Sequence, residues 1–288
     1  REIPLDGKTY SHSLIIEEAF SFIEKNAREK KPFFAYFAVC PPHGKYVVPD
    51  QGVYKDKPWS DTVKNFAAMC TLLDTNVGDL MKLLSKLGID DNTIVFYTSD
   101  NGPWNQDKYT KKKKGHPEGS IFWGASGPLR NGKGSCYEGG YRLPCIVRWP
   151  GRVPAGRESD AIFATIDFLP TFANLAGFKV PADRRIDGID QTGLLLGKTE
   201  TGRAHFYFDR AGVRRGKWKY LKATAHFYGY AVENDREKVE ELYDLDADIG
   251  ETTNRAAGHP EIVAELKKLM EDIESPRAGR TDAARPPG

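Results

Sequence analysis

The chain has 288 residues, of which 40% are hydrophobic and 28% charged, the ordinary composition of a globular protein. A formal net charge of +2 gives no basis for binding nucleic acid or an acidic membrane surface, and no apolar run is long enough to span a bilayer. The length suits one large domain with a small appendage.

The N-terminus, "REIPLDGKTYSHS", has neither an initiator methionine nor a signal-peptide pattern. We therefore expect Arg1 to follow an internal cut, with any targeting segment lost. The cysteines match no metal-ligand spacing, and we expect Cys40 and Cys70, in apolar runs, to act as small buried hydrophobes. Whether Cys136 and Cys145 form a disulfide stays open, because spacing does not determine pairing.

Helices and strands alternate through the first third of the chain. Apolar residues at helical spacing predict amphipathic helices over residues 11–30 and 60–88, with Ser60 or Asp61 as the N-cap of the second and Gly88 ending it. The runs "PFFAYFAVC" (32–40) and "NTIVFYT" (92–98) predict strands. This order implies parallel strands and a doubly wound α/β sheet.

The second predicted strand ends abruptly in "SDNGP", residues 99–103. Ligands bind beyond the carboxyl ends of strands in open α/β sheets, and Asp100 and Asn101 offer hard oxygen ligands for Ca²⁺ or Mg²⁺ there. A turn that merely caps the strand is the alternative. Because both strands end in polar sequence, His43 and the Asp-Asn pair are expected at the same sheet edge.

The remainder of the chain divides near residue 197. Residues 103–144 form a long loop region, followed by a strand in "CIVRW" (145–149) and a helix ending at Gly177. Short strands within 203–223 and 240–246 predict a small antiparallel sheet, which a helix over 259–274 follows. We expect domains at 1–197 and 198–288, the second ending in a disordered tail from residue 275.

Several motifs together resemble the C-terminal two-thirds of a type I sulfatase, an arylsulfatase-like family of the alkaline phosphatase superfamily. They are "NTIVFYTSDNGPW", "SGPLRNGKGSCYEGGYRLPCIVRWPG", "DFLPTFANLAG" and "ELYDLDADIGETTN", in the family's order. The stretch "PHGKYVVP" after the first strand also resembles bacterial arylsulfatases. The resemblance implies an alkaline phosphatase-like fold and hydrolysis of sulfate esters.

The resemblance also implies roles for individual residues. Asp100 and Asn101 are expected to be Ca²⁺ ligands, which favours the metal interpretation over the capping turn. Lys133 in "LRNGKGS" is expected to contact the sulfate as a point charge, and His43 to help protonate the leaving alcohol. Glu138 and Arg142, in "YEGGYRLP", are expected to stabilise the loop. Three further candidates, for contacting the substrate, are Trp104, His116 and Trp123.

The chain departs from the family at the nucleophile. Sulfatases carry a cysteine or serine in C/S-x-P-x-R that is oxidised to formylglycine, and no cysteine here fits. Ser126 to Arg130, "SGPLR", matches formally, but no strand-to-helix junction surrounds the serine, so we interpret the match as coincidental. The formylglycine and two further metal-binding carboxylates are therefore expected outside this chain, which would be inactive alone.

Two alternatives to the sulfatase remain. A phosphoester or phosphonate hydrolase of the same superfamily would be expected to carry more metal-binding His and Asp residues. A non-catalytic sulfatase-like fragment would only bind anionic glycans. For a sulfatase we expect a sulfated small molecule or glycan as substrate and a periplasmic or secreted location, with the oligomeric state undetermined.

Overall fold

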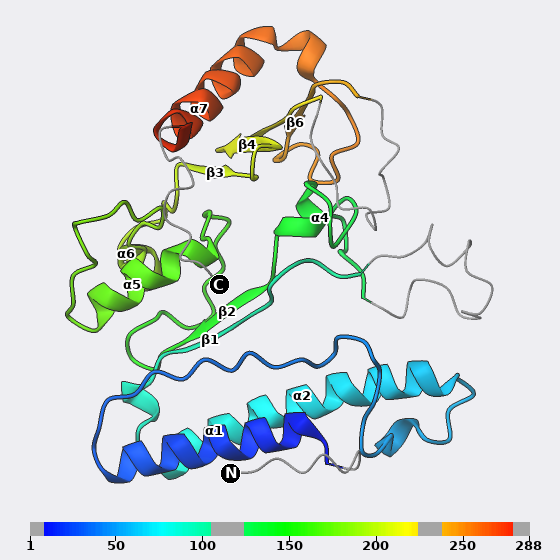
Figure 1. Cartoon of the computed structure of the whole chain (residues 1–288), viewed down its shortest axis with the longest axis vertical. Helices are drawn as coiled ribbons and strands as arrows, with labels where there is room; N and C mark the ends of the chain where they lie inside the picture. The colour runs from blue at the N-terminus through cyan, green and yellow to red at the C-terminus, as the bar shows by residue number, and fades with distance from the viewer. Residues whose placement is uncertain (1–8, 105–123, 224–237, 279–288) are drawn as a thin grey trace, which may run out of the picture. The chain divides into compact units, whose positions relative to one another are not determined.

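The computed structural model of the protein describes residues 9–104, 124–223 and 238–278 (Figure 1). The chain forms two compact units, one of Arg1–Val95 with Arg148–Gly151 and the other of Phe96–Val147 with Arg152–Gly288. The boundary near residue 197 stays a prediction.

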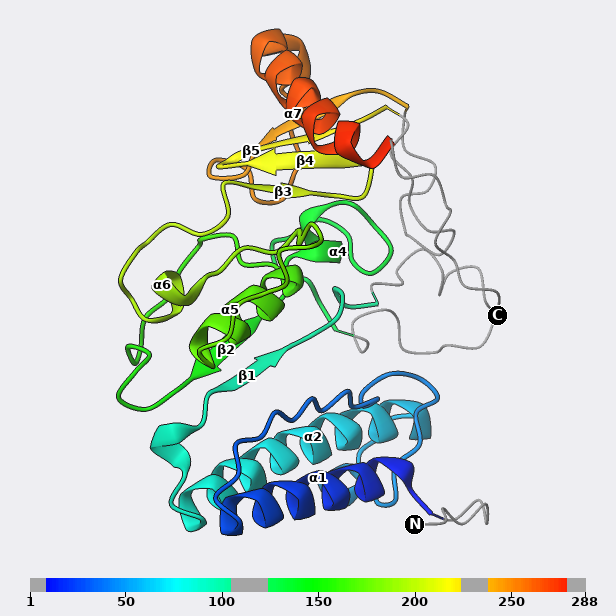
Figure 2. The same cartoon turned by 60° about the vertical axis from the view of Figure 1, so that its left-hand side comes forward.

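Two long helices build the first unit. Helices α1 (Ser11–Arg28) and α2 (Asp61–Lys86) confirm both predicted helices, and they lie side by side in Figures 1 and 2. Ile23 of α1 packs with Leu83 and Leu84 of α2 in an apolar cluster. Ser60 is the N-cap residue of α2, and Gly88, at φ 67°, follows its end. The amphipathic spacing of the apolar residues in α1 and α2 thus buries one stripe of each helix.

Residues 32–40 do not form the predicted strand. Burial alternates along this segment, with Phe33 and Phe37 packed on the α1–α2 cluster and Phe34 and Tyr36 71% and 82% exposed. The chain is thus extended with two-residue periodicity, but it joins no ladder of hydrogen bonds with another described strand. Periodicity predicts the backbone conformation, whereas a strand also needs a neighbour.

Short elements complete this unit. The 3₁₀ turns η1 (Gly52–Tyr54) and η2 (Asp90–Asn92) flank α2. Arg148 donates two hydrogen bonds of 2.7 Å to the carboxylate of Asp90, and Trp149 Nε1 donates to Asp91 O at 2.9 Å. These contacts hold residues 148 and 149 against η2.

Strands β1 (Val95–Thr98) and β2 (Cys145–Arg148) form a two-stranded sheet. Both were predicted from their β-branched and aromatic residues. Thr98 Oγ1 donates to Pro144 O at 2.9 Å, where β1 ends and β2 is about to begin. The 4-residue helix α4 (Glu138–Tyr141) interrupts the long loop region between them.

A helical segment follows β2. The turn η4 (Thr165–Asp167) leads into α5 (Phe168–Leu175), and α6 (Thr192–Leu195) follows. Gly177, at φ 77°, ends α5 as predicted. Asp167 is fully buried and accepts hydrogen bonds from the backbone N–H groups of Ala164 and Ile189, each at 2.9 Å. This buried carboxylate therefore fixes the loops around α5.

The predicted small antiparallel sheet is confirmed. Its strands, in spatial order, are β3 (His205–Tyr207), β4 (Gly212–Arg215), β5 (Trp218–Leu221) and β6 (Glu241–Asp244). In its register Val213 pairs with Tyr220 and Tyr220 with Leu242, so these three side chains share one face.

Helix α7 (Pro260–Ala278) covers that face, after the turn η5 (Ala256–Gly258), as Figure 2 shows. Val263, Leu266 and Met270 of α7 pack on the three strand residues. The helix continues past residue 274, so residues 275–278 correct the predicted disordered tail. Extending an existing helix by one residue costs far less free energy than nucleating a new one. The composition of residues 275–278 does not reveal that a helix precedes them.

The four cysteines are free. Cys136 is buried, but Cys40 is exposed and Cys70 is only half-buried, so the expectation that these two act as buried hydrophobes is wrong. Cys40 ends the extended segment 32–40, where every second side chain faces outward. Within the described parts of the chain, the helices are too short or too polar to cross a membrane.

Candidate active site

The predicted metal ligands lie where β1 ends. The carboxylate of Asp100 is exposed and Asn101 is half-buried beside it. Ser99 Oγ donates weakly to Asp100 Oδ1, at 3.4 Å. Among the described residues, neither the Asp100 nor the Asn101 side chain accepts a backbone N–H bond of the kind a strand-capping turn requires. The oxygens of this pair therefore remain available for a cation.

Two backbone hydrogen bonds join the segment after Asn101 to the loop that carries Lys133. Gly102 N donates to Gly140 O at 3.0 Å, and Lys133 N donates to Pro103 O at 2.8 Å. The backbones approach so closely that a Cβ on Gly102 would overlap Gly139 O. Glycine is thus required at position 102, and the structure brings Asp100, Asn101 and Lys133 into one assembly.

The loop from Arg130 to Tyr141 is closed by its own backbone. Gly139 N donates to Arg130 O at 2.9 Å, so the two ends of the loop meet. Asn131 has φ 62°, a left-handed conformation that Asn tolerates, and its side-chain oxygen accepts from Gly132 N at 2.9 Å. The loop presents Lys133 from a defined turn.

Lys133 lies beside Trp104, one of the predicted substrate-contacting residues. Its Nζ atom is 5.9 Å from the centre of the indole ring, and the lysine is only half-buried. Trp104 itself is 36% exposed. A partly exposed ammonium next to an aromatic face suits an anionic group carried on an apolar or sugar ring.

A buried cluster of charges lies directly beneath this loop. We call Glu138, Arg214, Lys219 and Glu251 the buried ionic cluster. Lys219 Nζ lies 3.0 Å from Glu138 Oε1 and 2.9 Å from Glu251 Oε1, and Arg214 Nη1 lies 3.2 Å from Glu138 Oε2. Lys219 and Glu251 are fully buried, and Glu138 is 2% exposed. Two cations therefore balance two carboxylates away from water.

The cluster affects its two carboxylates in opposite directions. Burial raises the pKa of Glu138, but Lys219, Arg214 and Arg142 more than offset this, so its pKa lies below the ordinary value. Burial raises the pKa of Glu251, and the opposing effects of Lys219 and of the backbone N–H of Glu138 do not overcome it. Glu251 is thus the carboxylate whose charge is less well compensated.

Arg130 connects the loop to the same sheet. Its Nη1 donates to Tyr243 OH at 3.0 Å and to Glu251 O at 2.6 Å, and its guanidinium lies 3.8 Å from the centre of the Tyr137 ring. Tyr137 and Tyr243 both donate to Glu241 Oε2 at 3.0 Å. Burial and Glu241 raise the pKa of Tyr243, which keeps its hydroxyl a donor.

These contacts agree with the expectation that Glu138 stabilises the loop, whereas Arg142 forms a more exposed pair with Asp160 at 2.8 Å. The sequence argument missed Lys219, Arg214 and Glu251. Lys219 and Arg214 are charged residues on two short strands, a pattern normally explained by a solvent-facing side of the sheet, and Glu251 lies in the loop after β6.

His43 belongs to the first compact unit, and its side chain is exposed. Its Nδ1 atom lies 2.6 Å from Gly44 O, which makes Nδ1 the donor and leaves Nε2 to face other groups. The predicted residues His116 and Trp123 lie outside the described residues. The roles of all these residues stay predictions.

The family profile of the sulfatases matches residues 2–178, and that of the C-terminal region of N-sulphoglucosamine sulphohydrolase matches residues 132–276. This chain belongs to the sulfatase family. An N-acetylgalactosamine-6-O-sulfatase of Bacteroides thetaiotaomicron is 33% identical over 273 residues, covering 91% of this chain and 50% of the relative. An N-acetylgalactosamine-6-sulfatase of Canis lupus familiaris is 34% identical, covering 79% of this chain and 41% of that relative.

Solved structures bear out the fold of this sulfatase chain. One, from the metabolism of multiple glycosaminoglycans by Bacteroides thetaiotaomicron, matches with a TM-score of 0.75 at 32% identity, covering 92% of this chain and 54% of the other. Another, Ps i-CgsB in complex with k-i-k-neocarrahexaose, matches with a TM-score of 0.71 at 26% identity, covering 92% and 55%. The predicted α/β fold class is therefore confirmed. This sulfatase chain spans about half the length of the curated relatives it matches.

The donor set for a metal in the sulfatase chain is incomplete. Asp100 and Asn101 supply oxygen donors of the kind Ca²⁺ prefers, but Ca²⁺ takes about six to eight oxygens. The described residues contain no group of three or more His, Cys, Asp or Glu side chains placed to hold a metal. By their chemistry, Asp100 and Asn101 would therefore supply only part of a Ca²⁺ coordination shell.

Ser126, the formal match to the sulfatase nucleophile motif, is engaged in its own turn. Its Oγ lies 3.0 Å from Leu129 O and 2.6 Å from Asn131 O, and Arg130 of the motif points to the C-terminal sheet. No helix begins at Ser126, because residues 127–130 form turns. The geometry agrees with a coincidental match.

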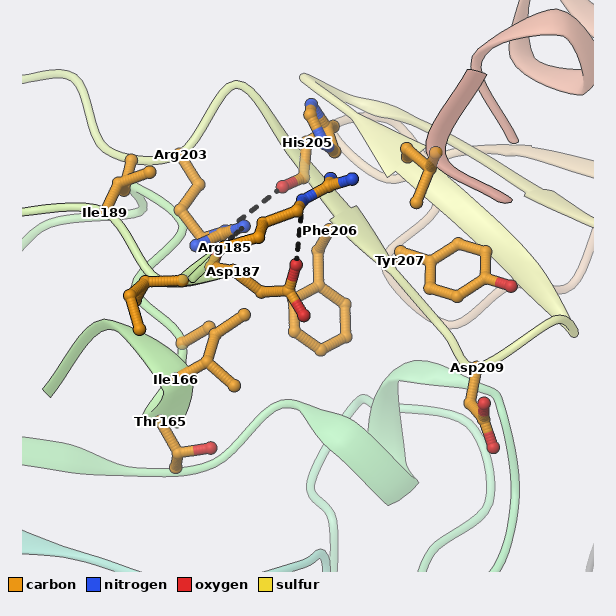
Figure 3. Close-up of a pocket in the computed structure, with 13 residues that line it drawn as sticks. Thr165, Ile166, Arg185, Asp187, Ile189, Arg203, His205, Phe206, Tyr207 and Asp209 are labelled. Atoms are coloured by element: carbon orange, nitrogen blue, oxygen red, sulfur yellow. Dashed lines mark hydrogen bonds and ion pairs between the residues drawn. The ribbon is translucent and has the colours of Figure 1, made fainter. Parts of the chain in front are cut away.

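An open cavity of about 490 Å³ lies elsewhere in the second unit, between the loop 185–189 and β3 (Figure 3). Arg203 is committed here to the buried carboxylate of Asp167 and donates to Asp187 O at 3.2 Å, and Arg185 Nε lies 3.3 Å from Asp187 Oδ1. None of the sequence-predicted site residues lines this cavity. Its arginines hold loops together, so the candidate active site remains the assembly around Asp100 and Lys133.

Proposed function

We propose that this chain is the C-terminal part of a sulfatase that hydrolyses a sulfate ester of a glycan. The observation that carries the proposal is the assembly of Asp100, Asn101 and Lys133 through the hydrogen bonds of Gly102 and Lys133 in a chain of the sulfatase family. Two relatives named for N-acetylgalactosamine 6-sulfate suggest a 6-O-sulfated hexosamine as the substrate class.

The residues have complementary tasks in this proposal. Lys133 binds a non-bridging sulfate oxygen as a point charge, and Trp104 offers its ring to the sugar. Asp100 and Asn101 provide two of the oxygens that hold a Ca²⁺ ion, which when bound supplies charge neutralisation for the sulfate. His43 donates its Nε2 proton to the departing sugar oxygen when both ring nitrogens carry a proton, since the Nδ1 proton is held by Gly44 O. The nucleophile, a formylglycine, is expected outside this chain, as is a signal for a periplasmic or secreted location.

The test is release of free sulfate from N-acetylgalactosamine 6-sulfate by the full-length protein. We expect Lys133→Ala and Asp100→Ala each to lower kcat/KM by a factor on the order of 100 or more, because Lys133→Ala removes a positive charge that faces the sulfate and Asp100→Ala removes a ligand of the cation that would neutralise it. Asp79 and Lys82 form an exposed ion pair of 3.0 Å on α2, so Asp79→Ala and Lys82→Ala are the matched controls. Wild-type activity in both site variants would refute the assignment.

Two further measurements separate the alternatives. Calorimetric titration with Ca²⁺ is expected to show binding to the wild type that Asp100→Ala weakens. A rate on the corresponding phosphate ester equal to or above that on the sulfate ester would favour a phosphoester hydrolase. Saturable glycan binding without any sulfate release, in a protein shown to be full length, would favour the non-catalytic alternative.

A further inference from the structure

We infer that the C-terminal sheet positions the loop that carries Lys133, and that Lys219 and Glu251 are the positioning residues. The expected effect of these residues on activity rests on the proposed function. The contacts of the buried ionic cluster are enough to show that it holds the loop.

Glu251 binds the loop at two points, Arg130 and Glu138. Its side-chain Oε2 accepts the backbone N–H of Glu138 at 2.6 Å, and its carbonyl oxygen accepts Arg130 Nη1 at 2.6 Å. Glu138 begins α4, where a backbone N–H has no partner within the helix, so the carboxylate satisfies a group that burial would otherwise leave unpaired. Lys133 lies between these two attachment points, three residues after Arg130 and five before Glu138.

The conformation of Glu251 indicates that the side chain is needed. Its backbone has φ 51°, in the left-handed region that non-glycine residues rarely adopt. Asp248 holds this turn through hydrogen bonds of 2.8 Å from the backbone N–H groups of Thr252 and Thr253. A glycine would satisfy such a backbone without strain, but it would provide no carboxylate for Lys219 or for the N–H of Glu138.

Lys219 fixes the cluster to the rigid part of the sheet. It lies in the middle of β5, paired with Arg214 of β4 and Tyr243 of β6, so both neighbouring strands hold its backbone. Its ammonium contacts Glu138, which belongs to the loop, and Glu251, which follows the last strand of the sheet. The charge-assisted hydrogen bond from Lys219 Nζ to Glu138 Oε1, at 3.0 Å, sets where Glu138, and with it the loop, can lie.

The loop in turn touches the segment of the predicted metal ligands. Gly102 N and Lys133 N bond across to Gly140 O and Pro103 O. A continuous set of contacts therefore runs from Lys219 through Glu251 and Glu138 to the loop and on to the residues beside Asn101. A buried ion pair adds little stability over an apolar pair of the same size, so its geometry is the better explanation for these charges.

The test compares Lys219→Met with Lys217→Met. Lys217 lies two residues away, has a side chain that is 44% exposed, and pairs at 2.7 Å with Asp244 of β6, outside the buried ionic cluster. Lys219→Met is expected to speed amide hydrogen exchange in residues 131–137 relative to wild type and to Lys217→Met. In the full-length enzyme it is expected to lower kcat per folded molecule by about 100-fold, with KM changed much less, because Lys133 is displaced from the transition state.

A merely structural role makes a different prediction. Lys219→Met would then lower the melting temperature but leave kcat per folded molecule, and exchange in residues 131–137, as in wild type, which would overturn the inference. Should Lys219→Met fail to fold, Arg214→Gln removes only one contact of the cluster, the 3.2 Å bond to Glu138. Arg214→Gln is expected to speed amide exchange in residues 131–137 and to lower kcat, each by less than Lys219→Met does. Unchanged values of both would overturn the inference.

The design also separates this inference from the proposed function. Lys133→Ala with full activity would refute the catalytic assignment, while faster exchange of the loop in Lys219→Met would still support positioning. Loss of activity in Lys133→Ala, together with wild-type kcat and exchange in Lys219→Met, would refute the positioning alone.

Discussion

The two faces of the C-terminal sheet are built from different chemistry. On one face Val213, Tyr220 and Leu242 pack under α7 in an apolar layer. On the other, Lys219 and Arg214 meet the carboxylates of Glu138 and Glu251 beneath the loop of Lys133. Both faces are buried, so exclusion of water does not distinguish them.

The difference shows how one sheet serves two purposes. Apolar burial is non-directional and scales with area, so the α7 face contributes stability but tolerates small shifts of its partner. Charge-assisted hydrogen bonds are directional, so the other face holds its partner in one place. The loop with the candidate catalytic lysine lies against the face of the sheet that carries Lys219 and Arg214.

The largest expected effect on stability comes from breaking the ionic face. Lys219→Met leaves two buried carboxylates without the ammonium that contacts both of them. We expect the free energy of unfolding to fall by about 3 to 5 kcal/mol. Urea unfolding measures this, and a loss below about 1 kcal/mol would mean that water reaches the cluster.

Breaking the apolar face should cost nearly as much stability without affecting the site. Leu266 of α7 is 2% exposed, and Leu266→Ala is expected to lower the free energy of unfolding by about 2 to 5 kcal/mol. Below the melting temperature, kcat should equal that of the wild type. Glu271→Ala, at an exposed position of the same helix, is the control and should change stability by less than about 0.5 kcal/mol. A fall in kcat with Leu266→Ala would show that the two faces are coupled.

The faces should also differ in their response to pH. The raised pKa of Glu251 means that between its ordinary value of 4.5 and its folded value the folded state binds more protons than the unfolded state. Its contribution to the free energy of unfolding is therefore fully present below 4.5 and is lost as the pH rises through the folded pKa.

Glu251→Gln removes this titration. The free energy of unfolding of the wild type minus that of Glu251→Gln is expected to decrease as the pH rises from 4.5 through the folded pKa of Glu251. Chemical unfolding of both proteins across that range measures it. The corresponding difference for Leu266→Ala should stay constant, and an increase with pH in the Glu251 comparison would mean that its folded pKa is lowered instead.

The smallest effect is expected at the rim of the sheet. Lys217→Met removes a partly exposed ion pair with Asp244 and should change the free energy of unfolding by no more than about 1 kcal/mol. Raising the salt concentration should weaken the Lys217 pair but leave the buried cluster nearly unaffected. If Lys217→Met lowered the free energy of unfolding as much as Lys219→Met, the exposed rim and the buried interior of the sheet would not differ in this respect.

The sequence by itself determined the local elements. The periodicity of residues 11–30 and 60–88 was enough for α1 and α2, and the short apolar runs with turn residues were enough for β1 to β6. The Asp-Asn pair after β1 was also recognisable from its residue types, which offer oxygen ligands for a cation, whereas Lys133 was singled out by the resemblance to sulfatases.

Only the tertiary structure decided which neighbours these elements have. Residues 32–40 have the alternation of a strand, but a ladder requires a partner, which local sequence does not report. Lys219 has the sequence pattern of a solvent-facing strand residue, yet the loop 130–141 covers it. Burial depends on segments distant in the chain, so the charges beneath the loop of Lys133 became visible only when the fold brought Glu138 and Glu251 together.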